Sequence, residues 1–360
     1  MSSRIGNKIT LQIFGESHQA AIGAVLDGLP AGEAIDEEAL SALMARRAAK
    51  SDGTTTARKE SDSVQILSGV RNGFTTGAPL ALTIANADVR SADYQPTLPR
   101  PSHADYPAFM RYGKHWDYRG GGQFSGRLTA AMTAAGGICL QILQRKGVTV
   151  AAQVLSIGAV SGKAFDALCP TERELNAVND AAFPASDTVV AEQMLLQIKN
   201  AAAEGDSVGG VIETCAIGLP AGLGEPLFGG VESRLSAALY GIPAVKAVSF
   251  GDGFALSSMK GSEANDAYEM KEAAVVTTTN HNGGILGGLT TGMPLRMYLA
   301  MKPTPSIAKE QQTVDMETGK NTALCIKGRH DPCVAVRAVP AVRAMTAFVL
   351  LDLMSERGLL

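Results

Sequence analysis

Five short segments of the 360-residue chain combine glycine with side chains that transfer protons or bind anions. They hold four of its five histidines and span residues 14–18, 100–106, 119–127, 280–288 and 327–332. Histidine has an unperturbed pKa of about 6.5, so it can donate and accept protons near neutral pH. Each histidine alone could be a structural hydrogen-bonding residue, but the shared setting favours a common site. The fifth, His115, lies among aromatic and charged residues, and we interpret it as structural.

Residues 120–127, GGGQFSGR, suggest how an anion could be held. Three successive glycines let a ligand lie against the main chain, and Ser125 can cap a following helix whose N-terminal N–H groups favour negative charge. Arg119 and Arg127 add forked donors. The segment therefore predicts a phosphate or carboxylate site, although such a turn can also be only structural. It is not a nucleotide P-loop, because the chain has no GxxxxGK[ST] sequence.

Further cations lie in other polar segments, at Arg46-Arg47, Arg58-Lys59, Lys302 and Arg329. The chain has a formal net charge of −3, so a broad nucleic-acid surface is not expected. Isolated basic points on a mildly acidic chain suit a small polyanionic ligand better. Solvated charge is the alternative, since Arg46 and Arg47 end a predicted helix, where cations are favoured in any case.

Two other kinds of site find no support in the sequence. The histidines form no HxxxH or HExxH pair, so no metal site is predicted. The residues around Ser17 read GESHQ, and Gln19 stands where the GxSxG elbow of a serine hydrolase requires glycine.

Short apolar runs separated by glycine and proline alternate with helical patterns. We expect strands over residues 9–14, 21–26, 64–67, 80–85, 148–160, 210–217, 245–250 and 294–301. We expect helices over residues 37–50, 126–146, 190–204, 231–240 and 341–357, with Asp36 and Ser125 as the first two N-caps. This mixed order indicates an α+β fold rather than a regular βα alternation.

The composition is that of a globular protein, with 46% hydrophobic and 19% charged residues. No apolar run reaches the roughly 18 residues of a membrane helix, and the N-terminus lacks an apolar signal core. Five scattered cysteines without a CxxC pair suggest reduced thiols. We therefore expect a cytoplasmic protein with no membrane or nucleic-acid partner.

Two pairs of similar sequences suggest an internal duplication. GLPAG occurs at 28–32 and 218–222, and TTGAPL at 75–80 is similar to TTGMPL at 290–295. The offsets differ, 190 and 215 residues, so chance recurrence of Gly-Pro turns is the alternative. If the duplication is real, one domain over 1–360 contains two intertwined similar halves, roughly 1–150 and 190–330. A site could then form where loops of both halves meet.

Seven motifs resemble the chorismate synthase family, and in chain order they are FGESH, RPSHADY, RGGGQFSGR, GDGF, NHNGGILGG, KPTPS and GRHDP. The resemblance implies a β-α-β sandwich with antiparallel sheets and an internal pseudo-duplication, assembled as a homotetramer. It implies 1,4-elimination of phosphate from 5-enolpyruvylshikimate-3-phosphate to give chorismate, the last common step toward the aromatic amino acids. It also implies reduced FMN (FMNH2) as cofactor without net redox change, with NADPH or an external reductase supplying the electrons.

The resemblance further implies roles for residues that match the motifs. His18 would be the acid beside the substrate phosphate, His103 would lie by N1 and the C2 carbonyl of the flavin, and Asp331 would assist proton removal near N5. The implied substrate ligands are Arg46, Arg47, Arg127, Ser17 and Ser125. The implied FMN ligands are Gln123, Phe124, Ser125, Pro243, Ala244, Gly287, Lys302, Pro303, Thr304, Pro305, Ser306 and Arg329.

The chain departs from the family pattern at several positions. The common RRRPG reads ARRAA at 45–49, and the frequent Arg-Ser-Ser reads Gln-Phe-Ser at 123–125, so one anion contact differs. Smaller departures are Pro243 for Asn, Gln19 and Ser102 for glycine, and Arg343 for Glu. None of these changes removes a proposed proton carrier.

Two other functions stay open on the residues alone. A flavin oxidoreductase with net hydride transfer would consume reduced flavin in proportion to product. A non-catalytic, anion-binding oligomer would lose no activity when His18 or His103 is replaced.

Overall fold

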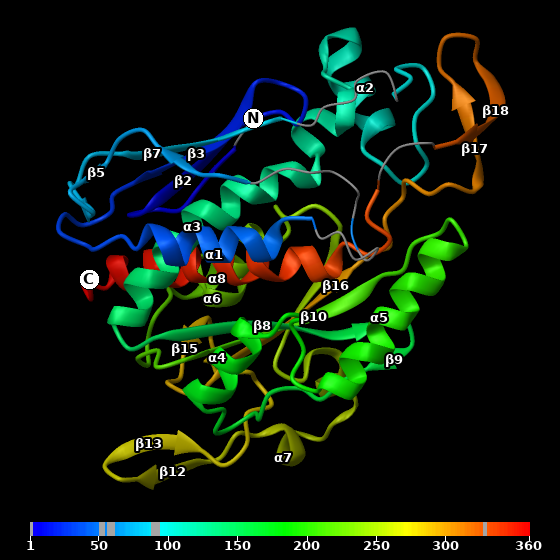
Figure 1. The fold of residues 1–360 in the computed structure, drawn as a ribbon. Coiled ribbons are helices and arrows are strands. Elements are labelled where there is room, and N and C mark those ends of the chain that lie inside the picture. Colours follow the sequence, from blue (N-terminus) through cyan, green and yellow to red (C-terminus); the bar gives the residue numbers. More distant parts are fainter. Residues whose placement is uncertain (1–2, 50–54, 56–61, 88–93, 327–329) are drawn as a thin grey trace.

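Two antiparallel sheets enclose a layer of helices in the computed structural model, which describes residues 3–49, 55, 62–87, 94–326 and 330–360 (Figure 1). The first sheet has the spatial order β1-β2-β3-β7-β4. Its strands are β1 (Arg4–Ile5), β2 (Thr10–Gly15), β3 (Ala21–Asp27), β7 (Leu80–Ala85) and β4 (Gln65–Ile66). The predicted α+β class and the sandwich arrangement are confirmed.

The second sheet has the spatial order β11-β16-β10-β8-β9. Its strands are β11 (Val245–Phe250), β16 (Leu295–Met301), β10 (Gly210–Ile217), β8 (Thr149–Ile157) and β9 (Val160–Ser161). The single strand expected over 148–160 is therefore wrong, because Gly158, with φ +54°, turns the chain back between β8 and β9.

Four helices fill the layer between the sheets, namely α1 (Glu37–Arg47), α3 (Thr129–Arg145), α6 (Val231–Leu239) and α8 (Ala335–Glu356). The Asp36 cap is confirmed, since its carboxylate accepts from Ala39 N at 2.9 Å. Ser125 Oγ accepts from Arg127 N at 3.3 Å, but it caps a 3-10 turn over Gly126–Leu128, and α3 begins after it without a side-chain cap. A Cβ at Gly136 would lie 2.2 Å from Ala344 O, so glycine there permits the close crossing of α3 and α8.

Helix α8 begins six residues before the predicted start at 341, because Pro340 lies inside it. A proline near a helix start removes only one internal hydrogen bond, so the helix continues through it. Among the described residues, α8 is also the one helix long and apolar enough to span a membrane. However, 89% of its most apolar stretch is buried inside the protein, which identifies it as the central core helix.

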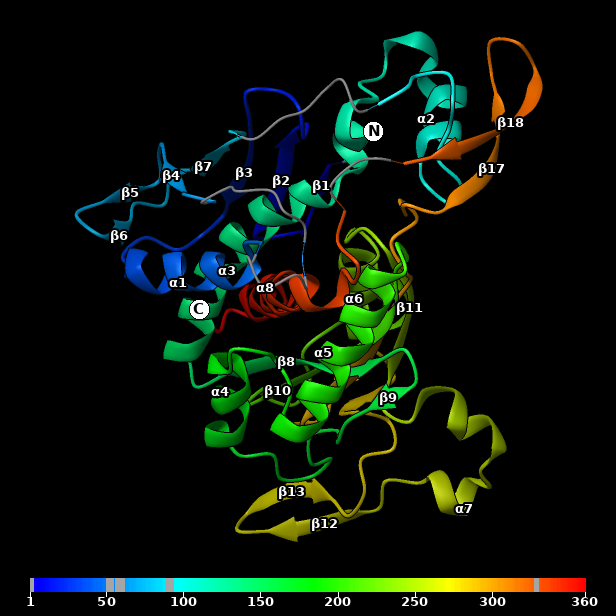
Figure 2. The ribbon, with the colours of Figure 1, turned by 45° about the vertical axis from the view of Figure 1, so that its right-hand side comes forward.

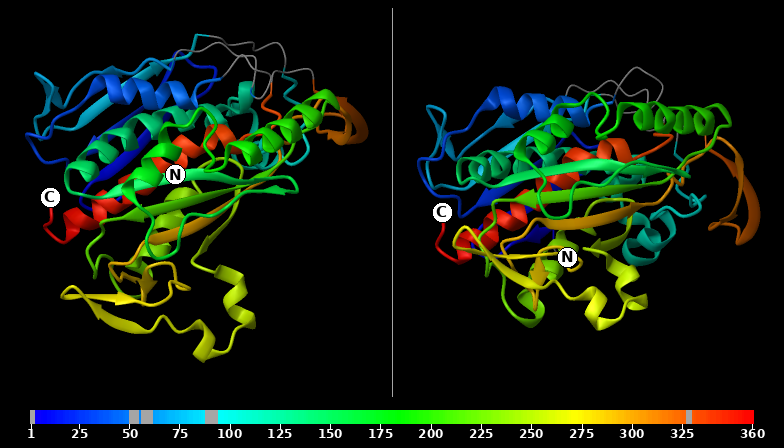
Figure 3. Two further views of the ribbon diagram at one scale, coloured as in Figure 1. Left: turned by 60° about the horizontal axis from the view of Figure 1, so that its bottom comes forward. Right: turned by 90° about the horizontal axis from the view of Figure 1, so that it is seen from below.

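The remaining elements lie outside the three layers. They are α2 (Asp105–Tyr112), α4 (Glu172–Asp180), α5 (Thr188–Ala203), α7 (Gly261–Ala264), β5 (Val70–Arg71), β6 (Phe74–Thr75), β12 (Tyr268–Lys271), β13 (Ala274–Thr277), β14 (Ile285–Leu286), β15 (Leu289–Thr290), β17 (Glu310–Asp315) and β18 (Lys320–Cys325). The β12–β13 hairpin and α7 project from the second sheet on the side away from α8 (Figures 2 and 3). The hairpin β17–β18 lies near α2, and Thr313 Oγ1 donates to Pro99 O at 2.5 Å.

The repeated sequences form matching turns. Thr75 Oγ1 donates to Pro30 O at 2.6 Å, and Thr290 Oγ1 donates to Pro220 O at 2.7 Å. Each hydroxyl also accepts from the backbone N–H three residues after that proline, in both cases at 2.9 Å. The strand orders β2-β3-β7 and β8-β10-β16 also correspond. Two similar halves, roughly 1–150 and 190–330, therefore stay our prediction.

One buried carboxylate, Asp352 on α8, joins the two chain ends to the helical layer. It accepts from the backbone N–H groups of Asn7, Lys8 and Ile9 at 2.8–2.9 Å and forms an ion pair with Arg234 of α6. Glu356, one turn later, contacts the same arginine at 3.1 Å but is partly exposed.

We expect Asp352→Asn to lower the free energy of unfolding by about 3 kcal/mol, because it leaves buried N–H donors and Arg234 without their acceptor charge. Denaturant unfolding measures the difference. Glu356→Gln is the control and should cost less than about 1 kcal/mol, because that pair is partly solvated. Equal losses of unfolding free energy in the two variants would show that the buried Asp352 stabilises the protein no more than the partly exposed Glu356.

Candidate active site

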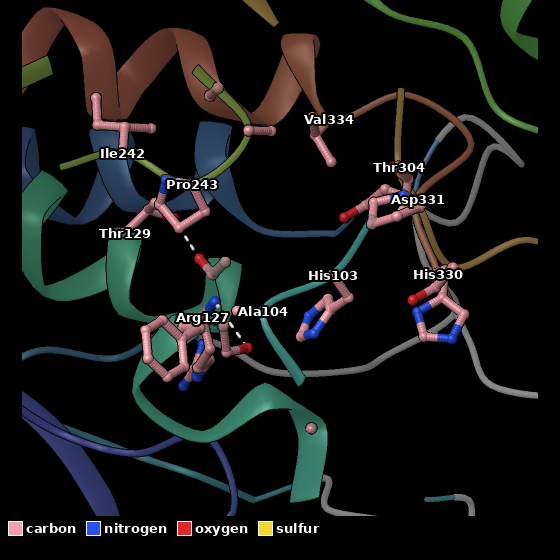
Figure 4. A pocket seen from close by; sticks show the side chains of 18 of the residues that line it. His103, Ala104, Arg127, Thr129, Ile242, Pro243, Thr304, His330, Asp331 and Val334 are labelled. Carbon is pink, nitrogen blue, oxygen red and sulfur yellow. Dashed lines mark hydrogen bonds between the residues drawn. The ribbon is translucent and has the colours of Figure 1, made fainter. Parts of the chain in front are cut away.

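A cavity of about 510 Å³ opens where loops of the first sheet, the start of α3, the turn before β11 and the start of α8 meet (Figure 4). Four of the five polar segments contribute to its lining. The predicted site residues that line it are His18, Arg47, His103, Gln123, Phe124, Ser125, Arg127, Pro243, Ala244, Lys302, Thr304, Pro305, Ser306 and Asp331. In Figure 4, His103, Arg127 and Asp331 lie around the same hollow, although they are far apart in the sequence.

Other predicted residues do not line this cavity. Ser17 lies behind His18, Pro303 is outside the lining, and Arg329 is not among the described residues. Arg46 points elsewhere and donates from Nη2 to Ala181 O at 2.7 Å. Gly287 lies in the β14–β15 hairpin, away from the cavity lining.

The segment 280–288 does not contribute to the lining of this cavity, so one site shared by all five segments stays a prediction. Its His281 Nδ1 lies 2.6 Å from the carboxylate of Asp252. Gly283, Gly284 and Gly288 pack tightly on neighbouring backbone, whereas a Cβ at Gly287 would meet no atom within 4 Å. A Cβ at Gly283 would lie 2.4 Å from Gly251 N. The bare backbone of this segment therefore allows loops of the second sheet to approach one another.

The three glycines at 120–122 make room for the two predicted catalytic histidines. All three have φ between +52° and +85°. A Cβ at Gly120 would lie 2.1 Å from His18 Cε1, and one at Gly121 would lie 3.0 Å from His103 Cε1. These glycines therefore serve the imidazoles, which press against the main chain, as well as any ligand that enters.

A carboxylate fixes the orientation of His103. Its Nδ1 lies 2.6 Å from Asp105 Oδ1 and 3.0 Å from Arg100 Nη2. The carboxylate only accepts and makes the shorter contact, so Nδ1 carries the proton and Nε2 the lone pair. Asp105 is itself held by Arg100, whose Nε and Nη2 donate at 2.7 and 2.8 Å. Burial lowers the pKa of His103, and the charge of Arg100 lowers it further against the opposing effect of Asp105. His103 is therefore neutral at pH 7.

Asp105→Asn should lower kcat about 10²-fold, since the amide no longer selects the Nδ1–H tautomer. It should also lower the pKa of His103 relative to the wild type, because the negative charge of Asp105, which raises that pKa, is lost. NMR titration of the imidazole measures this shift. Asp105→Glu keeps the charge and should retain more of kcat. An unchanged His103 titration in Asp105→Asn would contradict the proposed coupling.

The tautomer of His18 follows from Ser17. Ser17 Oγ lies 3.2 Å from both Arg119 O and His18 Nδ1. The carbonyl can only accept, so it takes the hydroxyl proton, and the serine lone pair faces an Nδ1–H of His18. The imidazole is 9% exposed and meets the ring of Tyr94 edge-on, with centroids 5.4 Å apart.

Two arginines share one buried carboxylate at the floor of the cavity. Arg47 of α1 and Arg127 before α3 both form ion pairs with Asp62. Burial lowers the pKa of Arg47 to about 10, so it stays protonated at neutral pH. Burial also opposes ionisation of Asp62, but the two guanidinium groups outweigh it and lower its pKa.

The described lining residues carry an excess of three positive charges. The five cations are Arg47, Arg100, Arg127, Lys302 and Arg337, and the two carboxylates are Asp62 and Asp331. A chain of net charge −3 thus concentrates positive charge in one hollow. Such a site attracts a small polyanion and stabilises it away from water.

Asp62 should make stability depend on pH on the acid side. Its pKa is lowered on folding, so its stabilisation is full above the unfolded value of about 3.9 and is lost as pH falls through the folded value. Asp62→Asn should therefore cost about 3 kcal/mol at pH 7 and flatten the acid loss of stability. Denaturant unfolding from pH 7 to pH 3 checks both effects. Glu33→Gln, which removes a more exposed pair with Arg145, should change neither by more than about 1 kcal/mol.

Comparison with known proteins decides the family. The family model described as Chorismate synthase matches residues 9–355. This chain belongs to the chorismate synthase family. Curated relatives named chorismate synthase include one from Dehalococcoides mccartyi, 42% identical over 100% of this chain and 98% of its own length. Another, from Aeropyrum pernix, is 45% identical over 99% of this chain and 94% of its own length. A solved structure titled Crystal Structure of Chorismate Synthase matches with a TM-score of 0.76 and 27% identity over 98% of this chain and 93% of its own.

Members of the chorismate synthase family are lyases that form chorismate in the shikimate pathway, toward the aromatic amino acids, and this chain is such an enzyme. The predicted recognition, enzyme class and reaction product are therefore confirmed. Its substrate is a small molecule, which agrees with a concave cavity of about 510 Å³ rather than an extended binding surface.

Sequence reasoning assigned no role to four charged residues of this site. Asp105 and Arg100 are part of RPSHAD, and their spacing of two and three residues from His103 was a signal that could have been used. Asp62 is 15 residues from Arg47 and 65 from Arg127, and no local pattern marks it. Arg337, which donates to Asp331 at 2.8 Å and to Arg47 O at 3.0 Å, lies on a helix that was predicted to start later.

Proposed function

We propose that the cavity binds reduced FMN together with 5-enolpyruvylshikimate-3-phosphate and eliminates phosphate from the ester. The observation that carries this proposal is the pair of histidines against one bare backbone, inside a hollow with an excess of three positive charges. The substrate brings a phosphate and two carboxylates, and FMN brings a further phosphate. Several fixed guanidinium groups suit this load of negative charge.

The residues present fit the cofactor. A cavity of about 510 Å³ is in the range that holds drug-sized ligands, and its lining combines apolar side chains such as Phe124 and Ile242 with fixed cations, which suits a ring that carries a phosphate. The residues proposed to hold FMN are Gln123, Phe124, Ser125, Pro243, Ala244, Lys302, Thr304, Pro305 and Ser306, with Pro303, Gly287 and Arg329 expected from the resemblance alone. When bound, reduced FMN supplies electron density transiently to the elimination and regains it without net oxidation.

The protein's own groups handle protons and charge. The departing phosphate gains negative charge as its C–O bond breaks. His18 in its doubly protonated form, with Nδ1–H directed to Ser17, would donate the Nε2 proton to it, while Arg47 and Arg127 hold the substrate anions. Ser17 fixes the His18 ring for this task, and Ser125 adds a hydroxyl at the start of α3.

His103 keeps a lone pair on Nε2 toward the cavity, where it can take up a proton and balance charge on the flavin. Asp331, held by Arg337 at 2.8 Å, assists removal of the C6 proton.

Further properties are proposed from the family alone. They are a homotetrameric assembly, a cytoplasmic location and electron supply to FMN either from NADPH or from a separate reductase. Arg46 is retained as a substrate ligand only from the motif, because its guanidinium lies outside the cavity.

Anaerobic turnover tests the proposal. Incubation with reduced FMN and the shikimate phosphate ester should release phosphate and chorismate in equal amounts while flavin absorbance returns to its starting value. Net flavin oxidation in proportion to product would instead indicate hydride transfer. Folded, flavin-loaded protein that leaves the ester intact would overturn the assignment.

A further inference from the structure

A second cavity, of about 30 Å³, shares helices α1 and α8 with the active site but has a different lining. Arg46 enters it from the last turn of α1, Arg343 from the middle of α8 and Asn179 from the last turn of α4. Arg46 is the neighbour of the active-site residue Arg47, so the two adjacent arginines serve different cavities. No residue lines both cavities, and of the second lining only Arg46 was also proposed, from the motif, as a substrate ligand.

Among the described residues, no carboxylate pairs directly with either of the two guanidinium groups in this cavity. Arg46 donates to Ala181 O and Arg343 Nε to Val150 O, at 2.7 and 2.8 Å, and both acceptors are neutral carbonyls. Within the described part of the chain, no carboxylate lies within 4.0 Å of either group. Asp180 attracts both from farther away. This contrasts with Arg47 and Arg127, which share Asp62.

The electrostatics show that the arrangement is unfavourable as it stands. Burial lowers the pKa of Arg343 to about 10, and repulsion from Arg46 contributes to the same shift. Both groups remain protonated at neutral pH, so two cations face one small hollow with incomplete compensation. A buried cation without a partner is costly, and an anion in the hollow would relieve both charges at once.

The amide oxygen of Asn179, in the same lining, has no hydrogen-bond partner among the described residues. Asn179 is 6% exposed, its Nδ2 donates to Val150 O at 3.1 Å, and its Oδ1 is buried with no hydrogen bond among the described residues. One water needs roughly 10–15 Å³ of such space. The cavity therefore has room for one ion of chloride size, which is somewhat larger than a water. The Asn179 Oδ1 is an acceptor, so it indicates a polar hollow and does not itself contact an anion.

We propose that this cavity is a binding site for a small inorganic monoanion of chloride size, which bridges Arg46 and Arg343. The ion joins α1 to α8 and lies beside the end of α4. A phosphate or carboxylate group is too large to enter fully. The site is independent of the proposed elimination, so its presence is tested without turnover.

Thermal unfolding in sodium chloride and in sodium gluconate at equal concentration tests the site, because gluconate is too bulky to enter. Chloride should raise the Tm of the wild type, relative to gluconate, by about 2 °C more than that of Arg343→Gln. Chloride-35 NMR should show line broadening by the wild type that falls at least about threefold in the same variant. Chloride bound in the active-site cavity would contribute equally to both proteins.

Arg343→Glu provides a second, opposite variant, since the new carboxylate can pair with Arg46. It should raise the Tm in gluconate and abolish the extra effect of chloride. The matched control for Arg343→Gln is Arg173→Gln, which removes one positive charge from an exposed position of α4. It should keep the wild-type chloride response. Equal chloride responses in the wild type, Arg343→Gln and Arg343→Glu, or no chloride broadening by the wild type, would overturn the proposal.

Discussion

Replacing His18 with alanine should lower kcat for chorismate formation by about 10²–10⁴-fold, the usual loss when a positioned acid is removed. The reason is that the His18 imidazole is buried beside the cavity and Ser17 holds its Nδ1, which orients the ring toward the substrate phosphate in the proposed complex. Steady-state phosphate release under anaerobic conditions, with saturating reduced FMN, measures the effect. His103→Ala should show a loss of the same order.

His115→Ala is the matched control for both histidine variants. His115 is exposed, lies outside the cavity lining and should leave kcat within about twofold of the wild type. FMN binding, followed by flavin fluorescence, should survive in His18→Ala, because His18 is assigned to the substrate phosphate. Full activity in His18→Ala would remove it from the mechanism and leave the family assignment intact.

Gly120→Ala should reduce kcat to about a hundredth or less, because the new methyl group and the His18 ring cannot occupy the same space. The added Cβ would lie 2.1 Å from Cε1 and 2.2 Å from Nδ1 of that ring. An imidazole displaced by about 1 Å can lose 10²-fold in rate. The residue also has φ +60°, which costs a further 1–2 kcal/mol, roughly, for any side chain.

Gly113→Ala separates these two effects. Gly113 has φ +61°, nearly the value of Gly120, but no atom lies within 4 Å of the position of its added Cβ. Its ψ of −144°, against +11° at Gly120, lies in a region that is essentially restricted to glycine. Gly113→Ala should therefore lose at least as much stability from backbone strain and keep its activity. Similar activity losses in the two variants would mean that strain, and not the contact with His18, explains the result.

Much of the fold was predictable, because its elements depend on local patterns. The strands at 10–15, 21–27 and 80–85 follow from alternation and glycine punctuation, and α1 follows from Asp36 and its apolar spacing. Helix α4 was missed although Thr171 and Glu174 form a capping box that the sequence displays. The early start of α8 was missed because Pro340 resembles a boundary and only burial of the whole helix outweighs it.

The sequence by itself determined which chemical groups the enzyme carries and the family to which it belongs: histidines, arginines and glycines in short segments of recognisable order. Only the tertiary structure decided which of them meet. It brings His18 and His103 to one glycine backbone and joins Arg47 to Arg127 through Asp62, while Arg46 and the segment 280–288 lie elsewhere. The reason is physical: charge and propensity belong to each residue, whereas contact between distant residues depends on how sheets and helices pack.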